Sequence, residues 1–133
     1  MCYAFLENTS YEIDCISAIL EHAGVAARSY SESAADEDAF LALDNTGAGI
    51  LHVATHGVCG SDDDMSSDDA MQKSFLVFAG ANQGNGSTDG DGLVTAAEVA
   101  SMNLRKCDLA VLSACETGLG TLGADGVFGL QRG

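Results

Sequence analysis

Two short apolar stretches decide the fold of this chain: residues 50–57 read ILHVATHG, and residues 109–118 read LAVLSACETG. Each begins with a run of apolar or small residues that is too short for a helix. Such runs are typical of strands buried on both faces, as in parallel sheets that helices cover. We therefore expect both stretches to be central strands of a mostly parallel sheet.

The amino-terminal third of the chain indicates two amphipathic helices. Thr9 and Glu12 have the spacing of a capping box, and isoleucines then recur on one helical face. Gly24 stands where this first helix is expected to end. A second helix is expected to begin at Ser33, with Asp36 in its first turn.

The second half of the chain carries two further helical patterns. Thr95 and Glu98 form another capping box before a predicted helix at residues 96–102. Residues 125–132 have an amphipathic spacing that predicts the beginning of a fourth helix. Because that pattern stops without a cap, we expect the domain to be truncated at its C-terminal end.

Strands and loops complete the pattern. Residues 25–30 and 75–79 are short apolar runs that indicate strands. Residues 61–73 and 80–92, rich in Asp, Ser, Gly and Asn, are expected to be loops. Strands and helices alternate, which predicts an α/β fold with a mostly parallel sheet. We expect a single domain over residues 1–133.

Composition argues against several classes of function. No apolar run approaches the roughly 18 residues that a membrane span needs. The net charge of −15 argues against binding nucleic acid, and it is expected to keep the protein soluble or to attract cationic peptides. Five irregularly spaced cysteines without a CxxC pair fit neither a structural zinc site nor a disulfide framework. We expect a cytoplasmic protein without metal or cofactor, which binds neither nucleic acid nor membrane.

Each of the two central strands runs into a residue with catalytic chemistry. His56 and Gly57 follow the first strand, and Cys115 follows the second. The carboxyl ends of neighbouring parallel strands meet at one edge of a sheet, where ligands bind in open α/β folds. An imidazole there can activate a thiol and later protonate a leaving amine, and the Gly57 and Cys115 N–H groups can stabilise an oxyanion. From spacing alone, a structural role for both side chains remains the commoner outcome.

The remaining histidines and cysteines have plainer interpretations. Three of them are expected to pack in the core or to be exposed: His22, His52 and Cys107. Cys59 lies close to His56 in the sequence and could be a second thiol at the same edge. Glu116, or the acidic loop at residues 62–64, is a candidate to supply negative charge to a substrate-binding pocket.

Two partial motif matches offer alternatives. Residues 87–98 resemble a calcium-binding loop, but Ser87 replaces the first Asp, and no entering helix precedes it. A GxGxxG pattern is formed by Gly118, Gly120 and Gly123. It does not follow its strand directly, and the chain ends before the acidic partner expected about 20 residues later. Calcium or nucleotide binding is therefore a minor alternative.

Several separated motifs together resemble the CHAT family, caspase-like peptidase domains often found beside tetratricopeptide repeats. The similar stretches are HVATHG (52–57), FAGAN (78–82), DGLVTAAEV (91–99), LAVLSACETGLG (109–120) and GVFGLQRG (126–133). His56 and Cys115 are 59 residues apart, close to the roughly 50 residues typical of caspases. The resemblance implies a caspase–hemoglobinase-like three-layer sandwich, a catalytic dyad of His56 and Cys115, and cleavage of peptide bonds.

The resulting hypothesis is a cysteine endopeptidase that acts on protein or peptide substrates. Gly57 and Glu116 are its candidate oxyanion and substrate-binding residues. In proteins that resemble this one the domain is usually attached to a repeat or sensor module, so a regulatory module of that kind is an expected partner. The alternative is a catalytically inactive, caspase-like interaction module.

Overall fold

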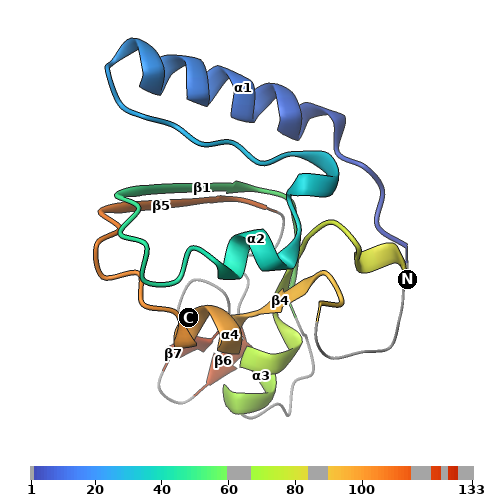
Figure 1. Cartoon of the computed structure of the whole chain (residues 1–133). Coiled ribbons are helices and arrows are strands. Elements are labelled where there is room, and N and C mark those ends of the chain that lie inside the picture. Colours follow the sequence, from blue (N-terminus) through green and yellow to red (C-terminus); the bar gives the residue numbers. More distant parts are fainter. Residues whose placement is uncertain (1, 60–66, 84–89, 115–120, 124–125, 129–133) are drawn as a thin grey trace.

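The computed structural model describes residues 2–59, 67–83, 90–114, 121–123 and 126–128 (Figure 1). These residues form helices, one parallel pair of strands and two antiparallel sheets. The α/β class expected from the sequence is therefore confirmed.

The two stretches that decide the fold form the parallel pair. β1 (Ile50–Ala54) pairs with β5 (Leu109–Ser113) in a register that sets Ile50 opposite Leu109 and Ala54 opposite Ser113. Both strands are confirmed, but Ile50 and Leu109 are 45% and 52% exposed. The expectation that both strands are buried on both faces is wrong, because only one face of the pair is closely covered.

Helices lie on both sides of this pair, but only one of them packs closely against it. Figure 1 shows α1 (Glu7–His22) on one side of β1 and β5, and α2 (Glu37–Leu41) on the other. Leu51 and Val53, which point to the same face of β1, pack into the core with residues of α2. No residue of α1 is buried, so its cover over the opposite face is loose.

A second sheet begins one residue after β1. It contains β2 (His56–Val58), β3 (Phe75–Val77) and β4 (Leu93–Thr95) in that order, and both pairings are antiparallel. The expectation of a mostly parallel sheet is therefore wrong for the described residues. Three-residue strands joined through loops and short helices can reverse direction freely, which the apolar content of each strand does not reveal.

The third sheet replaces part of a predicted helix. β6 (Thr121–Gly123) and β7 (Gly126–Phe128) pair antiparallel. The helix predicted for residues 125–132 is therefore wrong at 126–128, which form a strand. The other residues of that prediction, the first part of the GxGxxG match and residues 87–89 of the calcium-loop match lie outside the described residues.

Helix α1 begins before its predicted capping box. Leu6 is the N-cap residue, and Thr9 lies in the first turn, where its hydroxyl donates to the Leu6 carbonyl at 2.7 Å. The capping-box prediction for Thr9 and Glu12 is therefore wrong. Gly24 follows the end of the helix with φ = +76°, a left-handed conformation that confirms the predicted stop.

Helix α2 also begins at a different residue from the one predicted. A 3₁₀ turn, η1 (Glu32–Ala34), precedes it, and Asp36 is its N-cap. The Asp36 carboxylate accepts a hydrogen bond from the Ala39 N–H at 2.8 Å. The predicted start at Ser33 is wrong because that residue belongs to the separate 3₁₀ turn.

Two further segments differ from the predicted pattern. Residues 25–30 form no strand, and Val25 and Tyr30 are 43% and 41% exposed. An apolar run becomes a strand only when a neighbour satisfies its backbone groups, and among the described residues no strand pairs with this one. Within the loop predicted for 61–73, the structure has α3 (Ser67–Lys73).

Helix α4 (Ala96–Ser101) confirms the second capping box. The Thr95 hydroxyl accepts from the Glu98 N–H at 3.2 Å, and the Glu98 carboxylate accepts from the Thr95 N–H at 2.7 Å. Glu98, the last position of the calcium-loop match, is thus engaged in capping. A short 3₁₀ turn, η2 (Ala81–Gln83), lies in the loop predicted for 80–92.

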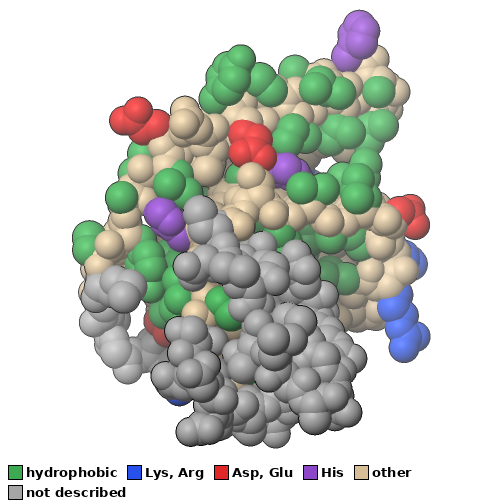
Figure 2. Space-filling model, turned by 180° about the vertical axis from the view of Figure 1, so that it is seen from behind, with side chains coloured by type: hydrophobic (Ala, Val, Ile, Leu, Met, Phe, Trp, Pro, Cys, Tyr) green, Lys and Arg blue, Asp and Glu red, His purple; other side chains and the backbone are tan. Residues whose placement is uncertain are grey.

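The core joins α2 and α4 to the parallel pair and to the sheet of β2, β3 and β4. Its buried members are at most 7% exposed: Phe40, Val53, Leu76, Val94 and Ala96. The rings of Phe40 and Phe78 lie 5.0 Å apart and tilted, a favourable aromatic geometry. Figure 2 shows that apolar side chains also gather along α1, outside this core. β2 is thus paired to a well-packed strand, and this pairing holds the backbone of His56.

Candidate active site

Thr55 joins the parallel pair to the antiparallel sheet immediately before His56. Its N–H donates to the Ser113 carbonyl at 3.2 Å, which continues the β1–β5 pairing by one residue. Its hydroxyl donates to the Val77 carbonyl of β3. This role of Thr55 was not predicted from the sequence, although its position directly before His56 was a usable signal. These two bonds fix the direction in which the chain leaves β1.

His56, the predicted base, is the first residue of β2 and is half-buried. Its Nε2 lies 2.7 Å from the carbonyl oxygen of Ala4, and its ring centroid lies 6.0 Å from that of Tyr3. Because a carbonyl oxygen can only accept, Nε2 carries the hydrogen in this contact. His56 therefore donates to Ala4 from Nε2, which leaves Nδ1 as the ring nitrogen that can accept a proton.

The other predicted site residues divide into two groups. Gly57 is buried in β2, opposite Leu76 of β3. Cys115, Glu116 and the acidic residues 62–64 lie outside the described residues. In the sequence, Cys115 follows the end of β5 by two positions, as His56 follows the end of β1 by two positions.

His52 takes part in a polar cluster that the sequence analysis missed. Its Nε2 lies 2.8 Å from one carboxylate oxygen of Glu12, and the Ser113 hydroxyl donates to the other oxygen at 3.3 Å. The three residues come from β1, α1 and β5, so Glu12 links the helix to both strands of the parallel pair. Glu12 had been assigned to a capping box from its spacing to Thr9, so its contacts with His52 and Ser113 were not predicted.

The remaining histidine and cysteine expectations concern packing and exposure. His22 is exposed in the last turn of α1, and Cys107 is half-buried, with its thiol donating to the Leu109 carbonyl at 3.3 Å. Cys59 is half-buried and accepts a hydrogen bond from the buried Ser74 hydroxyl at 3.7 Å. That contact fits a packing role for Cys59.

Glu37, the first residue of α2, is a buried carboxylate. It is 5% exposed, and it accepts a hydrogen bond from the Gly92 N–H at 2.9 Å. Burial raises the pKa of Glu37 above its ordinary value of 4.5, the Gly92 N–H partly opposes this, and nearby Asp91 adds to the rise. Gly92 has φ = +78°, and a side chain there would come within 2.4 Å of the Ala81 nitrogen. This close approach fixes the loop that carries η2.

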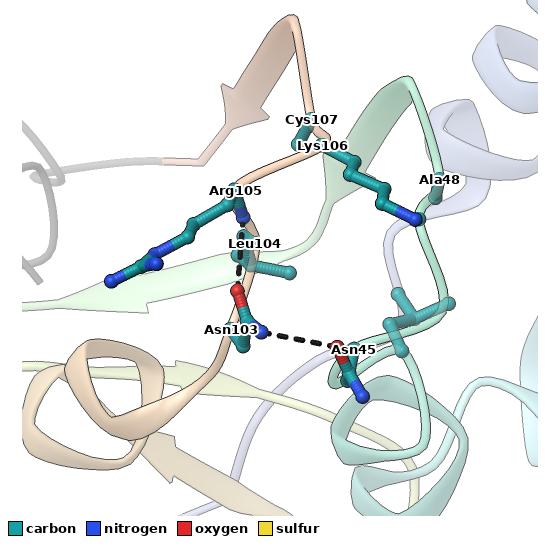
Figure 3. Close-up of a pocket in the computed structure, with 9 residues that line it drawn as sticks. Asn45, Ala48, Asn103, Leu104, Arg105, Lys106 and Cys107 are labelled. Carbon is teal, nitrogen blue, oxygen red and sulfur yellow. Dashed lines mark hydrogen bonds between the residues drawn. The ribbon is translucent and has the colours of Figure 1, made fainter.

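A small pocket of about 140 Å³ lies at the opposite end of the parallel pair (Figure 3). Its lining residues lie within 43–48 and 103–107, two segments that precede the starts of β1 and β5. The Asn103 amide donates to Asn45 at 3.0 Å, while the Arg105 and Lys106 side chains extend in opposite directions (Figure 3). Because these cations do not converge, the pocket is a poor anion site, and it lies away from the carboxyl ends of the strands.

Two other features are absent from the part of the chain that the structure describes. No group of three or more His, Cys, Asp or Glu side chains in that part is arranged to hold a metal ion. None of the helices described there is long and apolar enough to cross a membrane.

Comparison with known proteins identifies the family. No curated protein and no solved structure matches the chain. The family model of the CHAT domain matches residues 1–133. Since this match spans the whole sequence, the chain belongs to the CHAT domain family, a caspase-like family related to peptidases.

Proposed function

We propose that this chain is a cysteine endopeptidase module that hydrolyses peptide bonds, with Cys115 as nucleophile and His56 as base and acid. The observation that carries the proposal is the register of the parallel pair, in which Ala54 lies opposite Ser113. Both proposed catalytic residues follow that matched pair by two positions in the sequence. The CHAT family match supports the same assignment.

The proposed reaction uses ordinary thiol chemistry. His56 takes the proton of the Cys115 thiol, and the thiolate attacks the substrate carbonyl carbon. The carbonyl electron pair moves to oxygen, where the N–H groups of Gly57 and Cys115 are the proposed donors. When the carbon–nitrogen bond breaks, His56 protonates the leaving amine. Water then hydrolyses the thioester, with His56 accepting its proton, and the free thiol returns.

Family membership and net charge suggest the fold around this dyad, its regulator and its substrate. The domain is proposed to be a caspase–hemoglobinase-like sandwich, and a repeat or sensor module is the proposed regulator. The substrate is a protein or peptide. The net charge of −15 favours a cationic segment in that substrate, with Glu116 as a candidate contact.

Alkylation of the cysteines tests the dyad without needing a substrate. The rate for each of the five cysteines is measured against pH, resolved by peptide mass, in the wild type and in His56→Ala. We expect Cys115 to react fast below neutral pH and to become an ordinary thiol, with a pKa of about 8.5, in the variant. Cys2, which is exposed, is the internal control.

The contrary outcome has a definite meaning. If Cys115 reacts like Cys2 in both proteins, His56 does not activate it, and the inactive interaction module becomes the better description. A Cys115→Ala variant then completes the test, since a peptidase loses all turnover while an interaction module keeps its binding.

A further inference from the structure

Helix α1 turns one side toward the parallel pair and leaves the opposite side exposed. Glu12 marks the inner side, because its carboxylate contacts His52 of β1 and Ser113 of β5. Figure 1 shows α1 at the top of the view, with the rest of the described chain below it. Two large apolar side chains of the helix lie outside this contact, since Tyr11 is 74% exposed and Ile19 is 68% exposed.

The spacing of residues on this exposed side is that of a seam between two helices. Residues 8, 11, 15, 18 and 22 are separated alternately by three and four positions, which is the a and d spacing of a heptad pattern. Four of these five residues are exposed, and Cys15 is half-buried. The middle of the seam is apolar, with Tyr11, Cys15 and Ala18, and Ile19 follows directly beside it. A second helix can therefore cover the apolar side chains together.

A row of carboxylates runs along one edge of the seam. Glu7, Asp14 and Glu21 are spaced by seven residues, so they lie two turns apart on one line of the helix. All three are exposed, and none of them forms an ion pair in the part of the chain that the structure describes. A partner helix with Lys or Arg along the matching edge would supply these ion pairs.

We infer that the outer face of α1, meaning this seam and the acidic row beside it, is a docking surface for an amphipathic helix of another protein. The partner helix has apolar residues along its own seam and Lys or Arg beside them. Exposed apolar patches with a polar rim are typical of such interaction sites. The inference is independent of the proposed peptidase, because the surface contains neither residue of the proposed dyad.

Charge decides between this occupant and the other candidates. If a second copy of the chain docked with its α1 antiparallel, the acidic row would lie against the same row of the partner copy. Each copy also carries a net charge of −15, so two copies repel each other. Nucleic acids and anionic membranes are disfavoured for the same reason. A basic helix is the occupant that gains from both the apolar seam and the carboxylates.

Two synthetic helices test the surface. Each is about three heptads long with Leu at the a and d positions, and one has Lys at the e and g positions where the other has Glu. Binding to the full chain is measured by fluorescence anisotropy of the labelled peptides. We expect the Lys peptide to bind, with an affinity that falls as salt is added, and the Glu peptide not to bind. Equal affinity for the two peptides would overturn the inference.

Matched sets of charge variants separate docking on α1 from general attraction to an acidic protein. One triple variant combines Glu7→Gln, Asp14→Asn and Glu21→Gln, and the other combines Glu32→Gln, Asp38→Asn and Asp108→Asn, three exposed carboxylates outside α1. We expect the first variant to bind the Lys peptide roughly tenfold more weakly, the combined effect of three exposed ion pairs, and the second to bind as the wild type does. Equal losses in both variants would show that the peptide does not read the acidic row.

Substitutions of apolar side chains test the seam. Tyr11→Gln and Ile19→Gln are each expected to weaken binding of the Lys peptide roughly tenfold, because these side chains would be buried under the partner. Tyr30→Gln changes an exposed aromatic residue outside α1 and is the matched control. Circular dichroism checks that the helix content is unchanged. Wild-type affinity in both α1 variants would contradict docking on the seam.

Alkylation of Cys15 locates the bound peptide in the wild type, without any substitution. Saturating Lys peptide is expected to slow the alkylation of Cys15 severalfold and to leave unchanged that of Cys107, a half-buried cysteine in the segment before β5. An unprotected Cys15 in the presence of bound peptide would place the peptide elsewhere and overturn the inference. Sedimentation of the chain alone tests the other occupant: self-association that Tyr11→Gln abolishes would show that a second copy covers this face, and the basic partner would be wrong.

Discussion

The antiparallel sheet and the parallel pair differ in how well their side chains are buried. In the antiparallel sheet, Leu76 is 1% and Val94 is 0% exposed. In the parallel pair, Leu109 and Val111 are 52% and 36% exposed. Helix α1, which lies over one face of this pair, has no buried residue. Hydrophobic stabilisation follows the area removed from water, so it concentrates in the antiparallel part.

The proposed catalytic residues fall on the two sides of this difference. His56 belongs to the well-packed sheet, whereas Cys115 follows the strand with the exposed face. Thr55 lies between the two regions and is hydrogen-bonded to both. A well-packed part of the fold thus carries the proposed base, while the strand that leads to the proposed nucleophile is loosely covered.

Truncation of one leucine in each region gives the largest expected contrast. Leu76→Ala is expected to lower the free energy of unfolding by about 2–5 kcal/mol, because it leaves a cavity in the core. Leu109→Ala removes the same atoms from a half-exposed position and is expected to cost less than about 1 kcal/mol. Denaturant unfolding measures both. Similar losses in the two variants would mean that the parallel pair is as well packed as the antiparallel sheet.

The two Thr-x-x-Glu sequences give a smaller contrast of the same kind. Thr95→Ala removes the cap of α4 and is expected to cost about 1 kcal/mol of unfolding free energy. Thr9→Ala changes a residue inside the first turn of α1 and is expected to stay within about 0.5 kcal/mol. Equal effects in thermal or denaturant unfolding would contradict the position of the helix start at Leu6.

The buried Glu37 carboxylate gives the smallest effect, visible as a dependence on pH. Its pKa is raised in the folded protein, so the folded state binds the proton more tightly than the unfolded state does. Stability from this group is therefore full below pH 4.5, the ordinary pKa, and is lost as pH rises through the raised pKa. Glu37→Gln, which keeps an acceptor for Gly92, should gain stability relative to the wild type over that range.

A matched variant checks that the effect belongs to the buried group. Asp38→Asn removes an exposed carboxylate one residue along the same helix. Unfolding midpoints against pH should diverge from the wild type for Glu37→Gln and run parallel for Asp38→Asn. A divergence of the opposite sign would show that Glu37 is stabilised as an anion.

Local patterns in the sequence predicted individual elements well where the stabilising contact is also local. The Thr95–Glu98 box lies within one turn, and Gly24 needs only its own left-handed backbone, so both predictions hold. Thr9 and Glu12 had the same spacing but not the same role, because Glu12 contacts His52, 40 residues away. Asn82 was noticed only as part of a motif, since its partner Tyr3 is 79 residues distant.

The sequence by itself determined that β1, β3 and β5 are strands, that α4 begins at a capping box, and that His56 and Cys115 follow two strands. Three features follow from the tertiary structure alone: the second sheet is antiparallel, residues 25–30 pair with no strand that the structure describes, and most of β5 is exposed. It also decided that residues 3 and 4 lie against His56. Apolar content and capping act over a few residues, whereas strand direction, burial and the contacts of residues 3 and 4 with His56 depend on partners far away in the sequence.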